Sequence, residues 1–201
     1  MSDALIDILE VESTKNKIFM VAAHLIAEKG YHGVSMRELS EKSGVSKPTI
    51  YYYFNSKEGI YKELLDAAIV HLDKQLRRIQ SLQIPAKSKL IEFVKMSFQQ
   101  CAEYPEFVKM LLDLSNRRDE IPFIMSFRSE FGRKDRIIAE IIQEGIESGE
   151  FGANANPELA AEIINGVVVH FFWRQVGSNR RLITEGLAEE IIEMLFRGLN
   201  E

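Results

Sequence analysis

SMRELSEKSGVSKPTIYYYFNSK, residues 35–57, is the stretch that decides the fold of the N-terminal part of this chain. Ser35 opens a capping box, in which its hydroxyl accepts a hydrogen bond from an amide of the first helical turn. Gly44 follows where a helix begun at Ser35 needs a left-handed exit, which glycine adopts without steric penalty. Ser46 then provides a second N-cap, and Pro48 falls in the first turn of the next helix, where its missing N–H costs nothing. The pattern predicts two short helices joined by a glycine turn.

The second of these helices carries different residue types on its two faces. Ile50 and Phe54 are four residues apart, so we expect both to face the protein core. Tyr51, Tyr52 and Tyr53 cannot all share that face, and we expect them outside, with the alternative that one packs under the following helix. Phenol groups suit contacts with phosphates and with thymine methyl groups. A helix, a glycine turn and a second helix with a polar and aromatic outer face are typical of an element that enters the major groove of DNA.

Three sequence elements follow one another between about residue 14 and residue 62. They are an amphipathic helix ending in AEKGYHGVS, the segment MRELSEKSGVSKPTIYYYF, and the segment NSKEGIYKELL. In order and spacing, this N-terminal part closely resembles the DNA-binding domain of TetR-family transcriptional regulators. The resemblance implies an all-α fold of about nine helices. An N-terminal three-helix helix-turn-helix DNA-binding domain is followed in this fold by a larger C-terminal helical domain for ligand binding and dimerisation.

Matching the family motif residue by residue implies a set of DNA contacts. Arg37 stands near the start of the first of the two helices, where it can reach a guanine edge bidentately. Lys57, at the start of the next helix, is expected to hold a phosphate with help from the N-terminal amides of that helix. Met36 occupies a position where the family often has a hydroxyl residue, so no contact is expected from it. The expected DNA-contacting residues are Ser35, Arg37, Ser46, Lys47, Thr49, Tyr51, Tyr52, Tyr53 and Lys57.

The net charge of −5 is unusual for a DNA-binding protein, so its distribution along the chain matters. Residues 13–60 contain seven basic and four acidic residues, a balance of +3. Residues 1–12 contain four acidic residues, and the rest of the negative charge lies after residue 60. A basic module on an acidic body allows DNA phosphates to attract one face of the protein.

Helical periodicity continues almost to the end of the chain. A fourth helix is expected to begin after a cap at Asn55 or Ser56 and to end before Pro85. Further helices are expected at about residues 87–103, 105–115 and 123–148, and two more begin at Pro157 and at Thr184. This organisation predicts an acidic tail over residues 1–12, a DNA-binding domain over 13–60, and an effector-binding and dimerisation domain over 61–201.

The last two expected helices are amphipathic neighbours that either close the core of the chain itself or pair with a second chain. TetR-like proteins use their last two helices to build a four-helix bundle with a second subunit, and the resemblance therefore implies a homodimer. The residues expected at its interface are Ile164, Val167, Phe171, Leu187, Ile191 and Leu195.

Many of the 12 Phe and 7 Met residues lie between positions 93 and 173. Such side chains at helical spacing belong to a core more often than to a pocket, although pockets between helices have the same lining. The resemblance implies an apolar cavity for a small effector. The candidate ligand-binding residues are Phe127, Phe131, His170, Trp173 and Arg174. For His170 the alternative is a hydrogen-bonded core or interface histidine.

No catalytic, metal or membrane motif is present in the sequence. The histidines His24, His32, His71 and His170 are scattered, and no phosphate-binding glycine loop or nucleophile elbow occurs. The single cysteine, Cys101, excludes an internal disulfide and fits a reducing compartment. No apolar run approaches the ~20 residues of a membrane span, and the acidic N-terminus is unlike a signal peptide. We therefore expect a cytoplasmic protein that is no enzyme and carries neither cofactor nor metal.

Two functions remain after these exclusions. The first is a ligand-responsive transcriptional regulator, a repressor that a small apolar effector releases from a palindromic operator. The alternative is a DNA-bound architectural or cell-division-type protein that responds to protein partners and has no small ligand. An enzyme with a helix-turn-helix head is disfavoured, because the sequence has no catalytic constellation.

Overall fold

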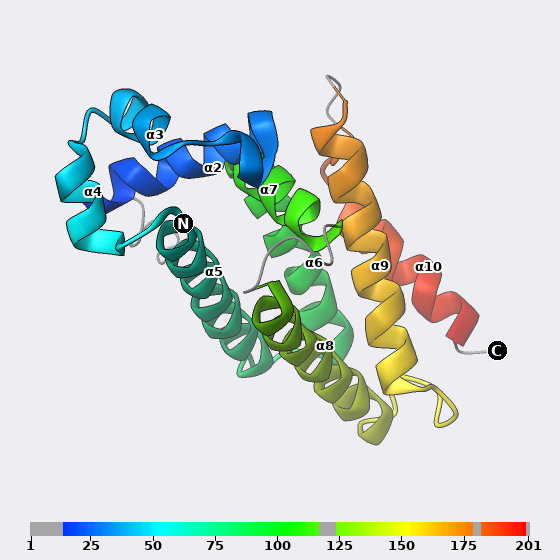
Figure 1. The fold of residues 1–201 in the computed structure, drawn as a ribbon. Coiled ribbons are helices and arrows are strands. Elements are labelled where there is room, and N and C mark those ends of the chain that lie inside the picture. The colour runs from blue at the N-terminus through cyan, green and yellow to red at the C-terminus, as the bar shows by residue number, and fades with distance from the viewer. Residues whose placement is uncertain (1–13, 117–123, 179–181, 200–201) are drawn as a thin grey trace. The chain divides into compact units, whose positions relative to one another are not determined.

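The computed structural model describes residues 14–116, 124–178 and 182–199, which form helices joined by loops (Figure 1). Within these ranges there are nine helices and no strand, and the all-α fold predicted from the sequence is confirmed. The helices are α2 (Thr14–Gly33), α3 (Met36–Ser43), α4 (Lys47–Phe54), α5 (Lys57–Gln80), α6 (Ala86–Glu103), α7 (Pro105–Asn116), α8 (Ile124–Glu147), α9 (Pro157–Val176) and α10 (Leu187–Leu199). None of the helices so described is long and apolar enough for a membrane span.

The chain divides into two compact units. One contains the chain up to Leu72 together with Lys109–Arg128, and the other contains Asp73–Val108 together with Ser129–Glu201. The long helix α5 runs without interruption from the first unit into the second. The domain boundary predicted after residue 60 separates a DNA-binding part from an effector-binding part, and it stays a prediction.

The core of the first unit is built by α2, α3, α4 and the start of α5. Ile18, Leu25, Leu39 and Ile50 are completely buried there. The rings of Phe19 on α2 and Phe54 on α4 lie 5.2 Å apart, and an ion pair between Lys15 and Glu63 joins α2 to α5. Gly30 has φ 71° and ψ 167°, so the regular part of α2 ends at this glycine.

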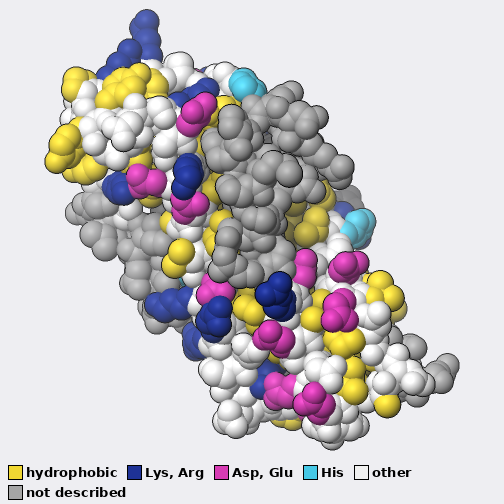
Figure 2. Space-filling view, turned by 60° about the horizontal axis from the view of Figure 1, so that its bottom comes forward, with side chains coloured by type: hydrophobic (Ala, Val, Ile, Leu, Met, Phe, Trp, Pro, Cys, Tyr) yellow, Lys and Arg dark blue, Asp and Glu magenta, His cyan; other side chains and the backbone are white. Residues whose placement is uncertain are grey.

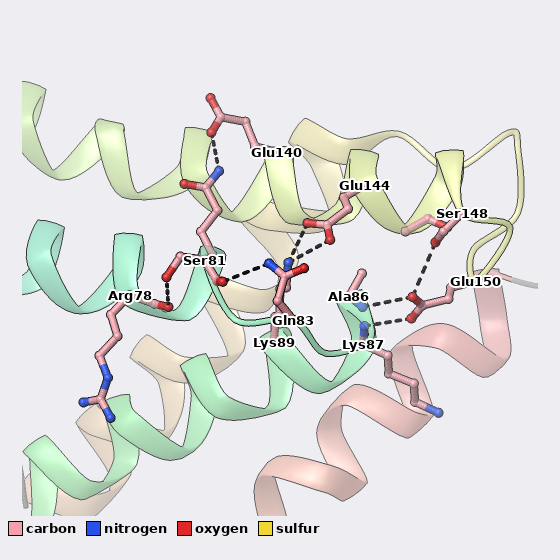
Figure 3. Close-up of polar contacts among 12 residues, drawn as sticks. Arg78, Ser81, Gln83, Ala86, Lys87, Lys89, Glu140, Glu144, Ser148 and Glu150 are labelled. Carbon is pink, nitrogen blue, oxygen red and sulfur yellow. Dashed lines mark hydrogen bonds and ion pairs between the residues drawn. The ribbon is translucent and has the colours of Figure 1, made fainter.

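In the second unit, Glu144 near the end of α8 and Glu150 just after α8 both bind α6 (Figure 3). The buried ammonium of Lys89 on α6 donates to both oxygens of Glu144, at 2.7 and 2.9 Å. The carboxylate of Glu150 accepts from the backbone amides of Ala86 and Lys87, at 3.0 and 3.1 Å. Glu150 therefore caps the start of α6 from a distant part of the chain, because Pro85 has no side-chain group that could do so.

Further contacts attach α5 and α10 to the same unit. Gln80, the last residue of α5, donates to Glu140 of α8 at 2.8 Å (Figure 3). Ion pairs of 2.6 Å join Lys87 to Glu193 and Lys95 to Glu189, so α6 and α10 are linked twice. The rings of Phe151 and Phe196 stack with centroids 4.0 Å apart.

The sequence-based helix boundaries agree with the structure within about one to two residues, except at the start of the last helix. The fourth helix ends at Gln80, within the limit set by Pro85. The last helix begins at Leu187 and not at Thr184, so that prediction is wrong. Gly186 has φ 84°, which is incompatible with a helix, and the helix starts only after it.

Candidate nucleic-acid interface

Side-chain caps and a glycine turn position the two short helices α3 and α4. The Ser35 hydroxyl accepts from the amide of Glu38 at 3.1 Å, and the Ser46 hydroxyl accepts from the amide of Thr49 at 3.3 Å. Gly44 lies between the helices with φ 67° and ψ 14°. An added Cβ there would meet no atom within 4 Å, so glycine is needed for its left-handed backbone rather than for space. The local geometry predicted from residues 35–57 is confirmed.

The exposed and buried sides of α4 are also as predicted. Ile50 and Phe54 are 0% and 2% exposed, whereas Tyr51, Tyr52 and Tyr53 are 46%, 83% and 40% exposed. Figure 2 shows hydrophobic side chains, with tyrosine in this group, gathered at the surface in the region of α3 and α4 at the upper left. Three exposed phenols on one short helix have no role in the core, and they give α4 a surface suited to DNA.

Charged residues surround this aromatic surface. Arg37 is exposed, and its Nε donates to Glu41 Oε1 at 2.7 Å, which leaves its terminal nitrogens available to a base edge. The Arg37 guanidinium lowers the pKa of the Glu41 carboxyl. Ser46 and Lys47 are exposed, while Thr49 is half-buried with its hydroxyl 2.8 Å from that of Ser46.

Lys57 has a structural role that the sequence did not indicate. Its ammonium donates to the carbonyl oxygens of Tyr31 and Val34, both at 3.0 Å, and lies 4.4 Å from the centre of the Tyr31 ring. Burial lowers the pKa of Lys57 and raises that of Tyr31 to about 12. A phosphate contact at Lys57 stays a prediction, and two of the three N–H donors of the ammonium already have acceptors in the protein.

Lys57→Met is expected to destabilise the protein by about 2–3 kcal/mol, because two buried carbonyl groups lose a charged donor. The free energy of unfolding from urea denaturation measures this effect. Lys62→Met is the matched control, since Lys62 makes only an exposed ion pair with Asp66 on the same helix. Equal stability of the two variants would show that the Lys57 contacts to the Tyr31 and Val34 carbonyls contribute nothing.

Glu41→Gln is expected to strengthen binding to non-specific DNA, because Arg37 is then no longer neutralised by its neighbour. In a plot of the logarithm of the binding constant against the logarithm of the salt concentration, the slope should become steeper by about 0.9 for each added phosphate contact. Fluorescence anisotropy with a random duplex at several salt concentrations measures both quantities. Asp73→Asn, which breaks the similar Arg77–Asp73 pair, is the control and should change neither. Identical slopes for wild type and Glu41→Gln would contradict the expectation.

The candidate ligand-binding residues do not form one site in the described structure. The side chains of Phe127 and Phe131 lie outside the described residues. His170, Trp173 and Arg174 are all exposed on α9 when the chain is alone, and the Arg174 guanidinium lies 6.0 Å from the Phe171 ring. His170 is thus not a core histidine of the single chain. Among the side chains that the structure describes, no three His, Cys, Asp or Glu residues are grouped as metal ligands.

Two of the residues expected at a dimer interface lie in the core of the chain itself. Ile164 and Ile191 are 1% and 8% exposed, so a second chain cannot reach them, while Val167, Phe171, Leu187 and Leu195 are half-buried. Other apolar residues are exposed instead: Leu159, Ile163 and Trp173 on α9 at 54%, 42% and 38%, and Met194 on α10 at 76%. Because α9 is apolar on most of its sides, periodicity alone did not distinguish its inner face from its outer face.

A capped helix, a glycine turn and an exposed aromatic helix define this protein as a helix-turn-helix DNA-binding regulator. Residues 18–64 match the family described as bacterial regulatory proteins, tetR family. Residues 18–64 are therefore a DNA-binding domain of the TetR family of transcriptional regulators.

Similarity to TetR-family regulators extends over nearly the whole chain. The fatty acid metabolism regulator protein of Bacillus subtilis is 24% identical over 188 residues, which cover 92% of this chain and 94% of the relative. The solved structure of FadR from Bacillus subtilis in complex with stearoyl-CoA has a TM-score of 0.79 at 24% identity, covering 90% of this chain and 97% of that one. The ketosteroid regulator KstR2 of Mycobacterium tuberculosis has a TM-score of 0.77 at 20% identity, with 95% and 97% covered. The fold of both units is therefore that of these regulators.

Proposed function

We propose that this protein is a repressor that binds a palindromic operator as a homodimer and leaves it when a long apolar effector binds. The observation that carries the proposal is the exposed surface of α4, with Tyr51, Tyr52 and Tyr53, beside the exposed Arg37. Arg37 would contact a guanine edge, while the tyrosines and Lys47 would contact phosphates and thymine methyl groups. A domain boundary near residue 60 would separate this DNA-binding part from the part that binds effector.

The dimer is supported by the exposed side of α9. Leu159, Ile163, Gly166, His170 and Trp173 follow one another at steps of four, three, four and three residues, and all five are exposed. This is the spacing of a helix seam that packs against another helix. A helix that is apolar on most of its sides is normally covered on all of them. A second copy of α9, related by two-fold symmetry, is the partner that covers this seam in our proposal.

Gly166 supports the same arrangement. It lies inside α9, where glycine costs about 0.8–1 kcal/mol relative to alanine. An added Cβ would meet no atom of the chain within 4 Å, so packing within the chain does not require glycine. A close approach by the backbone of a partner helix accounts for its presence, because glycine lets two helices come close together.

An acyl-CoA thioester is the effector class that we propose. One of the similar regulators is named for fatty acid metabolism and another is a ketosteroid transcriptional regulator, and FadR of Bacillus subtilis was solved with stearoyl-CoA. Apolar side chains pack between α6 and α9 in the second unit, where the Phe98 and Phe171 ring centres lie 5.7 Å apart, and an acyl chain bound among them would meet apolar surface.

The signal would pass through α5, which is one continuous helix shared by the two units. Its last residue, Gln80, is hydrogen-bonded to Glu140 of α8, so a shift of α8 would move the end of α5. Two recognition helices must lie about 34–36 Å apart to enter successive major grooves. An effector that prefers another separation would lower the DNA affinity by its differential affinity for the two states.

Fluorescence anisotropy tests the proposal with DNA selected from a random pool and with stearoyl-CoA added at micromolar concentration. The expected result is binding at physiological salt and release by stearoyl-CoA, with no release by coenzyme A alone. Selective DNA binding without release would favour a regulator that responds to protein partners. The absence of any sequence preference would contradict the proposed function.

A further inference from the structure

A polar cluster lies between α8 and α9 within the second unit, and no step described so far uses it. Asn165 of α9 is 8% exposed, and its Nδ2 donates to the carboxylate of Asp135 on α8. The Oδ1 atom of Asn165 is buried and accepts no hydrogen bond. Lys134, the residue next to Asp135, is half-buried in the same region.

The surroundings of Asn165 favour an apolar residue at this position. Its buried neighbours on α9 are Ala161, Ile164 and Val168, which are 0%, 1% and 2% exposed. A buried acceptor without a donor destabilises a protein, and an apolar side chain of similar volume avoids that loss. The unpaired Oδ1 atom is thus unexplained by packing, and such atoms in proteins often await a ligand or a water molecule.

Burial shifts the pKa of both charged members of the cluster. Burial and the Glu162 carboxylate raise the pKa of Asp135, which Lys134 opposes. Burial lowers the pKa of Lys134 to about 8, although part of the Lys134 side chain remains accessible. An ammonium has three donors, so Lys134 can bind a ligand oxygen in addition to an existing partner.

We propose that Lys134, Asp135 and Asn165 bind the polar group of the effector, and that this group pairs an N–H or O–H donor with an acceptor oxygen. The donor would bond to Asn165 Oδ1 and the oxygen to Lys134, while Asp135 orients the Asn165 amide. The thioester oxygen and the adjacent amide N–H of an acyl-CoA have this chemistry. The inference rests on the proposed function, and it adds the residues that distinguish an acyl thioester from a free fatty acid.

The test compares stearoyl-CoA with stearate, which has acceptor oxygens but no N–H donor at neutral pH. Asn165→Leu is expected to weaken stearoyl-CoA binding by at least about tenfold and to change stearate binding by less than about twofold. It is also expected to raise the melting temperature, because the unpaired acceptor is gone. Isothermal titration calorimetry and thermal denaturation of the full chain measure these effects. Asn165→Ala is the second variant if the leucine does not fit.

Ser97→Ala is the control, since Ser97 is a buried polar residue of the same unit whose hydroxyl donates to the Phe93 carbonyl at 2.9 Å. It should leave the preference for stearoyl-CoA over stearate unchanged. The inference would be overturned if Asn165→Leu and Asn165→Ala weakened the binding of both ligands equally, or left the binding of both unchanged. If stearoyl-CoA still released the wild-type protein from DNA, the proposed function would stand in either case. Wild type that binds neither probe would contradict both the inference and the acyl-CoA effector.

Discussion

Gly166→Leu is expected to give a folded monomer that no longer binds a two-fold operator. An added Cβ at residue 166 meets no atom of its own chain within 4 Å, and leucine favours the helix by about 0.8 kcal/mol over glycine, so the monomer itself should stay folded. In the dimer, however, the leucine would occupy the space that the backbone of the partner helix needs. A monomer contacts one half-site only and loses the affinity of the second. Sedimentation velocity at micromolar concentration and anisotropy with operator DNA measure the two effects.

Gln99→Leu is the control, because it also places a leucine at an exposed helical position. Gln99 belongs to α6 and is not part of the α9 seam. This variant should remain dimeric and bind DNA like wild type. A Gly166→Leu protein that stays dimeric with unchanged DNA affinity would show that α9 does not cross its partner at residue 166. A wild-type protein that is monomeric at micromolar concentration would contradict the proposed homodimer altogether.

Arg37→Ala combined with Tyr52→Ala is expected to cause the largest loss of DNA affinity without changing the oligomeric state. A bidentate contact to a base is worth about 1–3 kcal/mol, and a symmetric dimer loses it twice. The expected loss from Arg37 alone is therefore about 2–6 kcal/mol, which corresponds to a factor between about 30 and 3 × 10⁴ in the dissociation constant. Tyr52, the most exposed of the three tyrosines at 83%, should add to this loss. Anisotropy titrations at physiological salt measure the constants.

Arg77→Ala provides a matched control for the Arg37 substitution. Arg77 and Arg37 are both exposed, and each donates from Nε to an acidic residue four positions away, at 2.8 and 2.7 Å. Only Arg37 lies in the helix-turn-helix, so Arg77→Ala should bind the operator like wild type. If both arginine variants lost affinity equally, the effect would reflect net charge, and the position that we assign to the DNA contact would be wrong.

The sequence predicted the helix-turn-helix in detail because the interactions that form it are local. Ser35 and Ser46 cap helices through amides three residues away, and the conformation of Gly44 depends on its own backbone. The opposite faces of α4 follow from the four-residue spacing of Ile50 and Phe54. Local spacing and cap chemistry are sufficient for such features, so their prediction needs no knowledge of the rest of the chain.

Features that depend on distant residues were not predictable in this way. Lys57 bonds carbonyl groups 23 and 26 residues earlier, and Glu150 caps a helix that begins 64 residues before it. The outer seam of α9 was missed because apolar residues occur on most of its sides, and Ile164 was placed outside when it lies in the core. The unpaired Oδ1 atom of Asn165 has no signature in the sequence, since it becomes apparent only when α8 and α9 are packed together.

Selection of binding sites from a random DNA pool by the purified full-length protein tests the central claim most directly. Two copies of the tyrosine-bearing helix α4, related by a two-fold axis, predict an enriched inverted repeat whose half-site centres lie one helical turn, about 34–36 Å, apart or a multiple of it. Arg37→Ala protein, selected in parallel, should lose preference for a guanine at one position of each half-site. A pool without enrichment, or enriched in single half-sites without symmetry, would contradict the account of this protein as a dimeric operator-binding repressor.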